Sequence, residues 1–560
     1  MKRGVRLPWY RTGVMEANPA RVVWLRRAAV GCAVAVGAWT RSPLLGAPPT
    51  MDDHLQQALL DGTGPVSRPA WALFDFVRRG EAPALRDAGL LPWWTDDAFA
   101  LVMFRPLTSA TLWLDHALGW GPVGGHLHSL AWWLGMLAAT GWALRPMLPS
   151  TVGALALGLC AMSPTWTVPL GWMANRGVLV AGALGWAALG LWVRERWALA
   201  TGAMLLAALG GEYALGPCLV GLVWTLRGPR ASHCQLSRWA PAAGLGAILV
   251  LGRVLGAGAA GGRAYLDPLG APGEFLRALP ERLGCLFAEA LLMLNTVGPD
   301  GSAVGSAALP GWAAAFVLAL AVRRVRAGAE PSARRGLDAL GLGGVAALVA
   351  FGAVPVHGRV VAPVMACAAA MVAAVLLGAR AGGAPTWLRG VGLALAGLHL
   401  VAGPWRARVD AVGLRWVAEA STAGLVAGGE AARGARRVVL LAAPHPEMLH
   451  YTPMLWRRRL GIAVDWTVLA ATGAPVRRVF RADGGVDLEA GGVSLVAPWA
   501  WGMYRRGPLH VGHTQGVADM TVTVTEAPGG VPSRLRVRGV GEGVRWMRAR
   551  AWGLGPLEGP

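Results

Sequence analysis

Long apolar stretches dominate the chain, and short groups of arginines or glycines interrupt them. One membrane crossing takes about 17 to 25 residues, so the pattern predicts a mainly α, polytopic membrane bundle with about eleven spans. We expect these spans near residues 26–45, 126–144, 151–170, 177–193, 198–211, 213–226, 239–257, 308–322, 337–356, 360–379 and 390–404. The stretch 197–226 allows one long helix or two short ones, because Gly210-Gly211-Glu212-Tyr213 interrupts it.

Basic residues placed before the first apolar segment predict a cytoplasmic N-terminus by the positive-inside rule. They are Lys2, Arg3, Arg6, Arg11, Arg21, Arg26 and Arg27. A cleaved signal peptide is the competing interpretation of the apolar run Ala28 to Thr40. Under either interpretation the loop 46–125 lies outside, and arginines recur at each predicted inner loop. We expect a multi-pass protein of a bacterial-type cytoplasmic (inner) membrane.

After Trp405 the pattern changes to polar alternation and β-branched runs, such as 438–441 and 521–525. We therefore divide the chain into a transmembrane domain, 1–404, and a soluble C-terminal domain with β-strands, 405–560, that begins with a helix near 408–430. Because an odd number of spans, eleven, follows a cytoplasmic N-terminus, we expect this domain to face outside. Leucines at helical spacing among charged residues also predict a helix in the membrane interface near 273–297.

Composition agrees with a membrane protein: 54% of the residues are hydrophobic, 15% are charged, and the mean hydropathy is +0.45. The net charge of +21 is almost wholly arginine, because Lys2 is the only lysine. No basic stripe with interleaved aromatics indicates nucleic-acid binding. The six cysteines are scattered singly and lack metal-ligand spacing, so neither a disulfide framework nor a zinc site is indicated.

The outer loop is unusually acidic. Nine of the chain's 31 acidic residues fall in 46–125: Asp52, Asp53, Asp61, Asp75, Glu81, Asp87, Asp96, Asp97 and Asp115. Asp52 and Asp53 come directly after the first apolar segment, and Phe104-Arg105-Pro106-Leu107 follows about fifty residues later. Carboxylates are therefore concentrated where a site on the outer face would lie.

The order of several motifs over residues 24–226 resembles the N-terminal half of GT-C superfamily membrane glycosyltransferases, of the protein O-mannosyltransferase-like and lipid-A aminoarabinose-transferase-like kinds. The motifs are Asp52-Asp53, Phe104 to Leu107, Asp115, Gly125-His126-Leu127-His128-Ser129, Trp172 to Arg176, and Gly211-Glu212-Tyr213 with Pro217. The chain departs from these families in two places. Asp53 stands where a glutamate is frequent in mannosyltransferases, and Gly211 stands where a lysine is common.

The resemblance implies that an acidic residue of the first outer loop, Asp52 or Asp53, is the catalytic base and that the donor is a sugar on a polyprenyl phosphate. The chemistry agrees, because a carboxylate can take the proton of an acceptor hydroxyl and arginines can hold the leaving phosphate. Candidates for binding the donor phosphate or the substrate are Arg105, His128, Arg176, Glu212 and Arg359, while Arg263 also falls at a predicted outer helix end. The acceptor, whether glycan, lipid or protein, stays open. No cofactor is indicated, and a divalent metal stays open.

Each candidate also has a structural interpretation. Asp52 and Asp53 could cap a helix, as could Asp96 and Asp97, which are secondary candidates. His126, a further secondary candidate, is two residues from His128, and the two do not share a helical face as metal ligands at i and i+4 would. Arginines at helix ends could anchor the membrane interface, and Glu212 within an apolar stretch needs an ionic partner.

Two other classes of function compete with an integral-membrane glycosyltransferase. A transporter would place ionisable groups near the middle of the membrane and often show repeated halves, whereas here the charges collect at the outer edge. A non-catalytic scaffold or assembly protein would use the bundle as an anchor, and about eleven spans exceed what an anchor needs.

Overall fold

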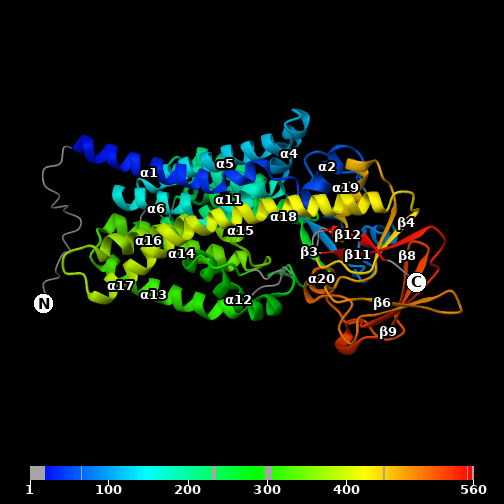
Figure 1. Ribbon diagram of the computed structural model, residues 1–560. Coiled ribbons are helices and arrows are strands. Elements are labelled where there is room, and N and C mark those ends of the chain that lie inside the picture. The colour runs from blue at the N-terminus through cyan, green and yellow to red at the C-terminus, as the bar shows by residue number, and fades with distance from the viewer. Residues whose placement is uncertain are drawn as a thin grey trace.

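The computed structural model describes residues 19–64, 66–229, 235–296, 305–445, 448–550 and 553–557. It is mainly helical, with a long helical bundle at one end and most of the strands gathered at the other (Figure 1). Lys2, Arg3, Arg6 and Arg11, on which part of the predicted orientation rests, lie outside the described residues.

Five helical segments are long and apolar enough to cross a membrane: Ala20–Gly46, Met173–Trp192, Gly305–Ala327, Gly358–Ala379 and Thr386–Ala431. A sixth is the pair Ser150–Met162 and Pro164–Gly171, bent by 50°, if the pair forms one span. The chain is thus a multi-pass membrane protein with fewer clear spans than the eleven predicted. Helices do occur at all eleven positions, but several of them, such as α9 and α10, are shorter than 18 residues. The count of eleven stays a prediction.

The bundle helices follow one another along the chain, and residues 46–120 are inserted between the first and the second of them. They are α1 (Pro19–Arg41), α5 (Gly121–Leu144), α6 (Ser150–Met162), α7 (Thr167–Gly171), α8 (Gly177–Trp192), α9 (Trp197–Gly210), α10 (Leu215–Leu226), α11 (Ala240–Val254), α12 (Pro272–Phe287), α13 (Ala308–Ala327), α14 (Pro331–Phe351), α15 (Gly358–Val361), α16 (Met365–Ala379), α17 (Thr386–Ala396) and α18 (Gly403–Ala431). Buried side chains of Trp, Leu, Met and Ala fill the space between them.

The stretch 197–226 forms two helices. α9 ends at Gly210, Gly211 has a φ of +142°, and a short 3-10 turn, η5 (Glu212–Ala214), precedes α10. Only glycine adopts that φ readily, so the interruption seen in the sequence is a true break. It places Glu212 between two helices rather than within one.

The last predicted span and the helix predicted after it form one continuous helical run of 46 residues, Thr386–Ala431. α17 passes through a π-helical turn, η11 (Gly397–Ala402), into α18. α18 leaves the bundle and reaches the strand-rich end of the molecule (Figure 1). One continuous helical run therefore joins the two parts.

The C-terminal region contains two sheets. An antiparallel sheet has the order β6-β7-β10-β9-β8, and a mixed sheet has the order β12-β11-β4-β5. Their strands and helices are β4 (Arg437–Leu440), α19 (Tyr451–Leu460), β5 (Asp465–Val468), β6 (Arg477–Phe480), β7 (Val486–Glu489), α20 (Pro498–Tyr504), β8 (Thr514–Val517), β9 (Met520–Glu526), β10 (Arg534–Arg538), β11 (Val544–Arg550) and β12 (Gly553–Pro556). The predicted strands 438–441 and 521–525 are confirmed as β4 and β9. In β9 and β10 the apolar side chains alternate into the core, as a half-buried strand requires.

The outer loop 46–125 folds onto this C-terminal region. It contains α2 (Asp52–Leu60), α3 (Ala82–Asp87), α4 (Pro106–Ala117), β1 (Asp75–Val77) and β2 (Ala100–Val102), and β2 also pairs with β3 (Gly258–Ala260). Trp93 and Trp94 are fully buried, and their indole N–H groups donate to the carbonyls of Leu469 (3.1 Å) and Ala500 (3.4 Å). The loop and the tail share one hydrophobic core and therefore lie on the same side of the membrane.

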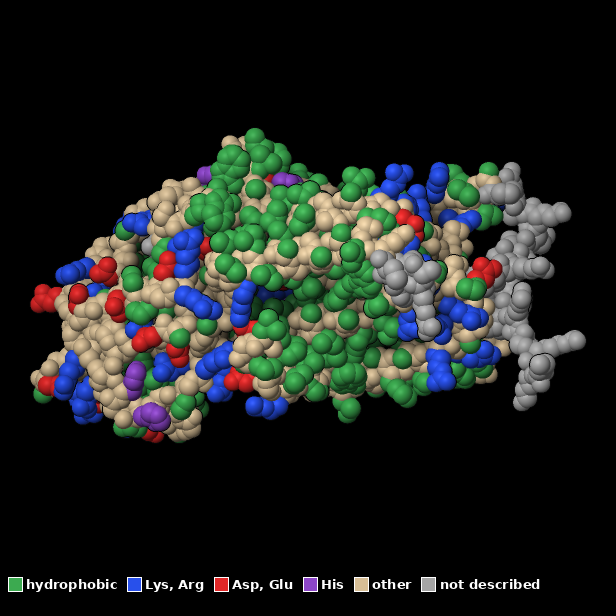
Figure 2. Space-filling model, turned by 180° about the vertical axis from the view of Figure 1, so that it is seen from behind, with side chains coloured by type: hydrophobic (Ala, Val, Ile, Leu, Met, Phe, Trp, Pro, Cys, Tyr) green, Lys and Arg blue, Asp and Glu red, His purple; other side chains and the backbone are tan. Residues whose placement is uncertain are grey.

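Charged side chains are unevenly distributed over the molecule. Figure 2 shows a broad apolar belt over the bundle, arginines at the end of the bundle away from the strands, and mixed charges over the strand-rich part. Arg323, Arg324 and Arg326 at the end of α13 and Arg334 and Arg335 at the start of α14 belong to the basic end. This is the charge pattern that the positive-inside rule associates with the cytoplasmic face.

Candidate functional site

The first turn of α2 carries the acidic pair. The residue before it, Met51, has φ +43° and ψ −120°, a strained backbone conformation for a residue other than glycine. Asp53 is buried, and its two carboxylate oxygens accept N–H hydrogen bonds from Ala174 (2.7 Å) and Thr50 (3.1 Å). Burial raises the pKa of Asp53 to about 7, although these two hydrogen bonds act to lower it. Asp53 thus fastens α2 to the turn η4 (Met173–Arg176).

Asp52 has a different environment. Its Oδ1 accepts a hydrogen bond from the hydroxyl of Tyr451, and no hydrogen-bond donor among the described residues reaches its Oδ2. Burial raises the pKa of Asp52, while the Tyr451 hydroxyl and the guanidinium groups of Arg359 and Arg105 act to lower it. Of the acidic pair, Asp52 is therefore the carboxylate with an oxygen left to accept a proton.

Arg105 and Glu212 form a partly buried ion pair at the break between α9 and α10, with Arg105 buried and Glu212 partly exposed. Arg105 Nε donates to Glu212 Oε2 at 3.0 Å, and Nη2 pairs with Oε1, so the contact is bidentate. The guanidinium carbon of Arg105 lies 5.1 Å from the ring centroid of Phe74 and 5.2 Å from that of Tyr213. A Cβ on Gly211 would lie 3.4 Å from Arg105 Nε, so the glycine lets the backbone approach the pair.

Arg359 is the least engaged arginine of the site. It lies in α15, a short helix capped by His357, whose Nδ1 accepts the backbone N–H of Arg359 at 3.2 Å. Its guanidinium stacks over Trp172 with 4.9 Å to the ring centroid, its Nε is buried, and no carboxylate or other side-chain acceptor among the described residues bonds to the guanidinium. It is close enough to Asp52 and Glu212 to lower the pKa of Asp52 and to act on Glu212. The Arg359 guanidinium forms no ion pair with the described residues, although Asp52 is a neighbour. Its N–H groups are therefore available to bind an anion such as a phosphate.

Tyrosines converge on the same place. The chain has five tyrosines, and the four in the described part of the structure all lie around Asp52 and Arg105. They are Tyr213, Tyr265, Tyr451 and Tyr504. Tyr504 lies in α20, and its hydroxyl is 3.3 Å from Nδ1 of His450. Burial lowers the pKa of His450 to about 4, so the neutral ring can accept that hydrogen bond.

Sequence reasoning missed Tyr265, His450, Tyr451 and Tyr504. All lie beyond residue 226, outside the stretch that carried the resemblance. The available signal was the rarity of tyrosine, since a residue type used only five times in 560 positions is informative where it recurs. Which tail residues meet α2, however, depends on how the tail packs.

Arg176, Asp115 and His128 form a separate buried network. Arg176 is fully buried, and its Nη2 lies 2.5 Å from Asp115 Oδ2. It also donates to Ser129 Oγ (3.0 Å) and to the carbonyl of Gly125 (2.8 Å). His128 Nε2 accepts from the indole N–H of Trp132 at 3.0 Å, which leaves the proton on Nδ1 to be donated to Asp115 Oδ1 at 2.6 Å. These donors are already occupied within the protein.

The secondary candidates lie apart from Asp52. His126 is buried with its two ring nitrogens facing the carbonyls of Leu170 (2.9 Å) and Ala47 (3.1 Å), so it joins α5 to α7 and to the segment that follows the first helix. Asp96 Oδ1 accepts from the N–H of Ala98 at 3.0 Å, and Asp97, with a side chain 75% exposed, pairs with Arg86 at 2.6 Å. Arg263 is exposed.

A cavity of about 350 Å³ adjoins the site, bounded by Glu212, Tyr265 and otherwise mostly apolar side chains of β2, α9 and α11. α11 presents Val250 and Val254 on its exposed face. Within the described ranges, no group of three or more His, Cys, Asp or Glu side chains is arranged to hold a metal ion.

Comparison with known proteins shows similarity of structure only. No family model matches the sequence, and no curated protein matches it significantly. The structure is similar to ArnT from Cupriavidus metallidurans bound to undecaprenyl phosphate, with a TM-score of 0.42, 16% identity, and coverage of 81% of this chain and 86% of ArnT. The apo state of the same ArnT gives a TM-score of 0.40, 16% identity, and coverage of 78% and 85%.

A third similar structure is the Archaeoglobus fulgidus oligosaccharyltransferase tethered with an acceptor peptide, with a TM-score of 0.41 and 10% identity. The match covers 80% of this chain and 64% of that protein. All three matches have TM-scores of 0.42 or below, so the resemblance to GT-C membrane glycosyltransferases stays a similarity of structure and assigns no role to this chain. Identities this low concern the fold alone.

Proposed function

We propose that this protein is an integral-membrane glycosyltransferase that moves a sugar from a polyprenyl-phosphate donor to an acceptor hydroxyl on the outer face of the membrane. Asp52 is the base, and Arg359 binds the phosphate of the donor. In this arrangement the bundle crosses a cytoplasmic membrane with the N-terminus inside, and the outer loop and C-terminal domain face outside.

One observation carries the proposal: Asp52 has an oxygen without a hydrogen-bond donor, and beside it Arg359 has no anionic partner among the described residues. The other two candidate arginines are committed to carboxylates of the protein itself, Arg105 to Glu212 and Arg176 to Asp115. Arg359 is partly buried, with its Nε shielded from solvent, and a partly buried cation without an anionic partner is unfavourable. A phosphate at Arg359 would relieve that cost.

The chemistry follows from these two groups. Asp52 Oδ2 accepts the proton of the acceptor hydroxyl. At the same time the hydroxyl oxygen forms a bond to the anomeric carbon of the sugar. The bond between that carbon and the phosphate oxygen breaks, and the polyprenyl phosphate leaves with the electron pair, stabilised by Arg359. Because burial raises the pKa of Asp52, its carboxylate is a stronger base than an exposed one.

The apolar cavity beside Glu212 and Tyr265 supports a lipid-linked donor over a soluble nucleotide sugar. Its apolar walls favour an isoprenoid chain, and the neighbouring α11 has an exposed apolar face through which a lipid can arrive from the bilayer. No phosphate-cradling glycine loop of the P-loop kind occurs in the sequence. The acceptor, a glycan, a lipid or a protein, would reach Asp52 from the side of the C-terminal domain.

Binding of undecaprenyl phosphate to the purified full-length protein tests the phosphate site without knowledge of the sugar. Loss of a charge-assisted hydrogen bond is worth about 1.5–3 kcal/mol, so Arg359→Ala should weaken binding by about 10- to 100-fold. Arg277→Ala removes an exposed arginine of α12 and is the matched control, expected to bind as the parent does. Equal affinity of the Arg359 variant and the parent would remove Arg359 from the donor site.

A further inference from the structure

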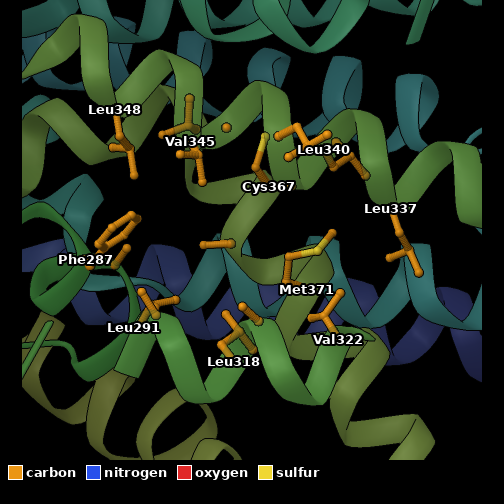
Figure 3. A pocket seen from close by; sticks show the side chains of 18 of the residues that line it. Phe287, Leu291, Leu318, Val322, Leu337, Leu340, Val345, Leu348, Cys367 and Met371 are labelled. Atoms are coloured by element: carbon orange, nitrogen blue, oxygen red, sulfur yellow. The ribbon is translucent and has the colours of Figure 1, made fainter. Parts of the chain in front are cut away.

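A second cavity lies in the bundle, away from the acidic pair. It has a volume of about 540 Å³ and is enclosed by α12, α13, α14 and α16 together with the π-helical turn η8 (Ala288–Leu292). Figure 3 shows Leu337, Leu340, Val345 and Leu348 of α14 facing Leu318 and Val322 of α13 across the cavity. Cys367 and Met371 of α16 lie between these two rows. The walls are apolar along this whole length.

The cavity has charged side chains at one end only. Arg323, Arg326 and Asp338 line it where α13 ends and α14 begins, at the basic end of the bundle. Arg326 is paired, because its Nε and Nη2 contact the two oxygens of Asp338 at 2.5 and 2.7 Å. Arg323 is exposed and forms no ion pair with any described residue. The rim therefore has an excess positive charge beside an apolar slot.

The slot faces the bilayer. Among the residues that line it, Phe316 and Leu342 keep 65% and 49% of their surface exposed, and few residues of α13 are buried within the protein. Leu337 and Leu348 are eleven residues apart on α14, a rise of about 16 Å at ~1.5 Å per residue. The hydrocarbon core of a bilayer is ~30 Å thick, so one leaflet supplies about the same length.

We infer that this cavity is a binding site for an anionic membrane phospholipid, whose headgroup phosphate contacts Arg323 and one of whose acyl chains fills the slot. Basic pockets between membrane helices at the cytoplasmic side are suited to such headgroups. The length of the slot fits one leaflet and its charge fits a phosphate. The inference does not depend on the proposed transferase activity, because Arg323 and Arg359 lie at opposite ends of the bundle.

Two variants test the site directly. Gly341 lines the slot, and a Cβ there would have Met371 Sδ at 3.4 Å as its nearest neighbour, so Gly341→Leu fills the cavity without a backbone clash. Its control is Gly202→Leu on α9, where an added Cβ meets nothing within 4 Å. Arg323→Ala removes the rim charge, and Arg324→Ala removes the adjacent arginine, which does not line the cavity.

The full-length proteins are delipidated in mild detergent and titrated with dioleoylphosphatidylglycerol or dioleoylphosphatidylcholine, with bound lipid counted by native mass spectrometry. We expect the parent and both controls to retain one phosphatidylglycerol per chain. Arg323→Ala should bind it about tenfold more weakly, and Gly341→Leu should lose it. Equal binding of the two lipids by the parent, or unchanged retention in either cavity variant, would overturn the inference. If Gly341→Leu does not fold, Arg323→Ala compared with Arg324→Ala decides.

Discussion

The hydroxyl of Tyr451 donates a hydrogen bond to Oδ1 of Asp52, although the two residues are 399 positions apart in the sequence. Tyr451 begins α19 of the C-terminal region, and Asp52 begins α2 of the outer loop. Tyr451 and Met454 also belong to a small hydrophobic core with Leu55 and Leu59 of α2. The C-terminal region is thus a wall of the proposed active site, and its hydroxyl fixes the orientation of the base.

Replacing Tyr451 by Phe should change the pH dependence of transfer. Burial raises the pKa of Asp52, and the Tyr451 hydroxyl counteracts this by stabilising the carboxylate. Without that hydrogen bond the pKa rises further. Because protonated Asp52 cannot accept a proton, the acidic limb of kcat/KM should move to higher pH. A hydrogen bond to a charged group is worth about 1.5–3 kcal/mol, which corresponds to about one to two pH units.

The matched control for this change is Tyr504→Phe, because the hydroxyl of Tyr504 contacts His450 and not Asp52. Its acidic limb should stay within a few tenths of a pH unit of the parent's. The same limb for Tyr451→Phe and the parent would show that the group titrating in the profile is not Asp52.

Replacing Asp52 and Asp53 by Asn, one at a time, should distinguish a catalytic carboxylate from a structural one. Asp52→Asn keeps an oxygen for Tyr451 and removes the base, so transfer of a lipid-linked sugar should fall about 100-fold or more with the melting temperature nearly unchanged. Asp53→Asn turns one acceptor into a donor facing a backbone N–H, which should cost about 1–3 kcal/mol of stability. Parent-level transfer by Asp52→Asn would make Asp53 the base.

The sequence predicted part of this site for a physical reason. Asp52, Arg105, Glu212 and Arg359 each lie at the end of an apolar stretch, and parity puts such ends on one face of a bundle. Tyr451 could not be placed in the same way. Periodicity describes how an element buries its own face, whereas the contact of α19 with α2 depends on a core that the outer loop and the tail build together.

The sequence also could not show which charged side chains form ion pairs with one another. Arg105, Arg176 and Arg359 were equivalent as arginines at outer helix ends, and only the fold shows that two of them face carboxylates of the protein. The number of spans was harder to predict, because short or bent helices such as α9 and the pair α6 and α7 pass as full spans in a hydropathy pattern.

Arg105 and Glu212 should behave as a structural pair in a double-mutant cycle. Arg105→Lys replaces a bidentate fork by a single ammonium and should cost about 1–3 kcal/mol, since hydrogen bonds to charged groups are of that size. The cycle uses the parent, Arg105→Met, Glu212→Gln and the double variant. The double variant removes both charges and should cost less stability than the sum of the costs of Arg105→Met and Glu212→Gln. Melting temperatures of the four proteins in detergent measure the coupling, and additive losses would mean that the pair does not interact.

Asp115→Asn should destabilise the protein without acting on donor binding directly. Arg176 is fully buried, and Asp115 is its only carboxylate neighbour within hydrogen-bond distance among the described residues, so the substitution leaves a buried charge uncompensated at a cost of about 3–5 kcal/mol. Asp97→Asn breaks an ion pair whose carboxylate is exposed and should cost less than about 1 kcal/mol. The material of each variant that stays folded should bind undecaprenyl phosphate with the parent's affinity. A loss of that affinity in folded Asp115→Asn, with an unchanged melting temperature, would instead place Arg176 and His128 at the donor phosphate.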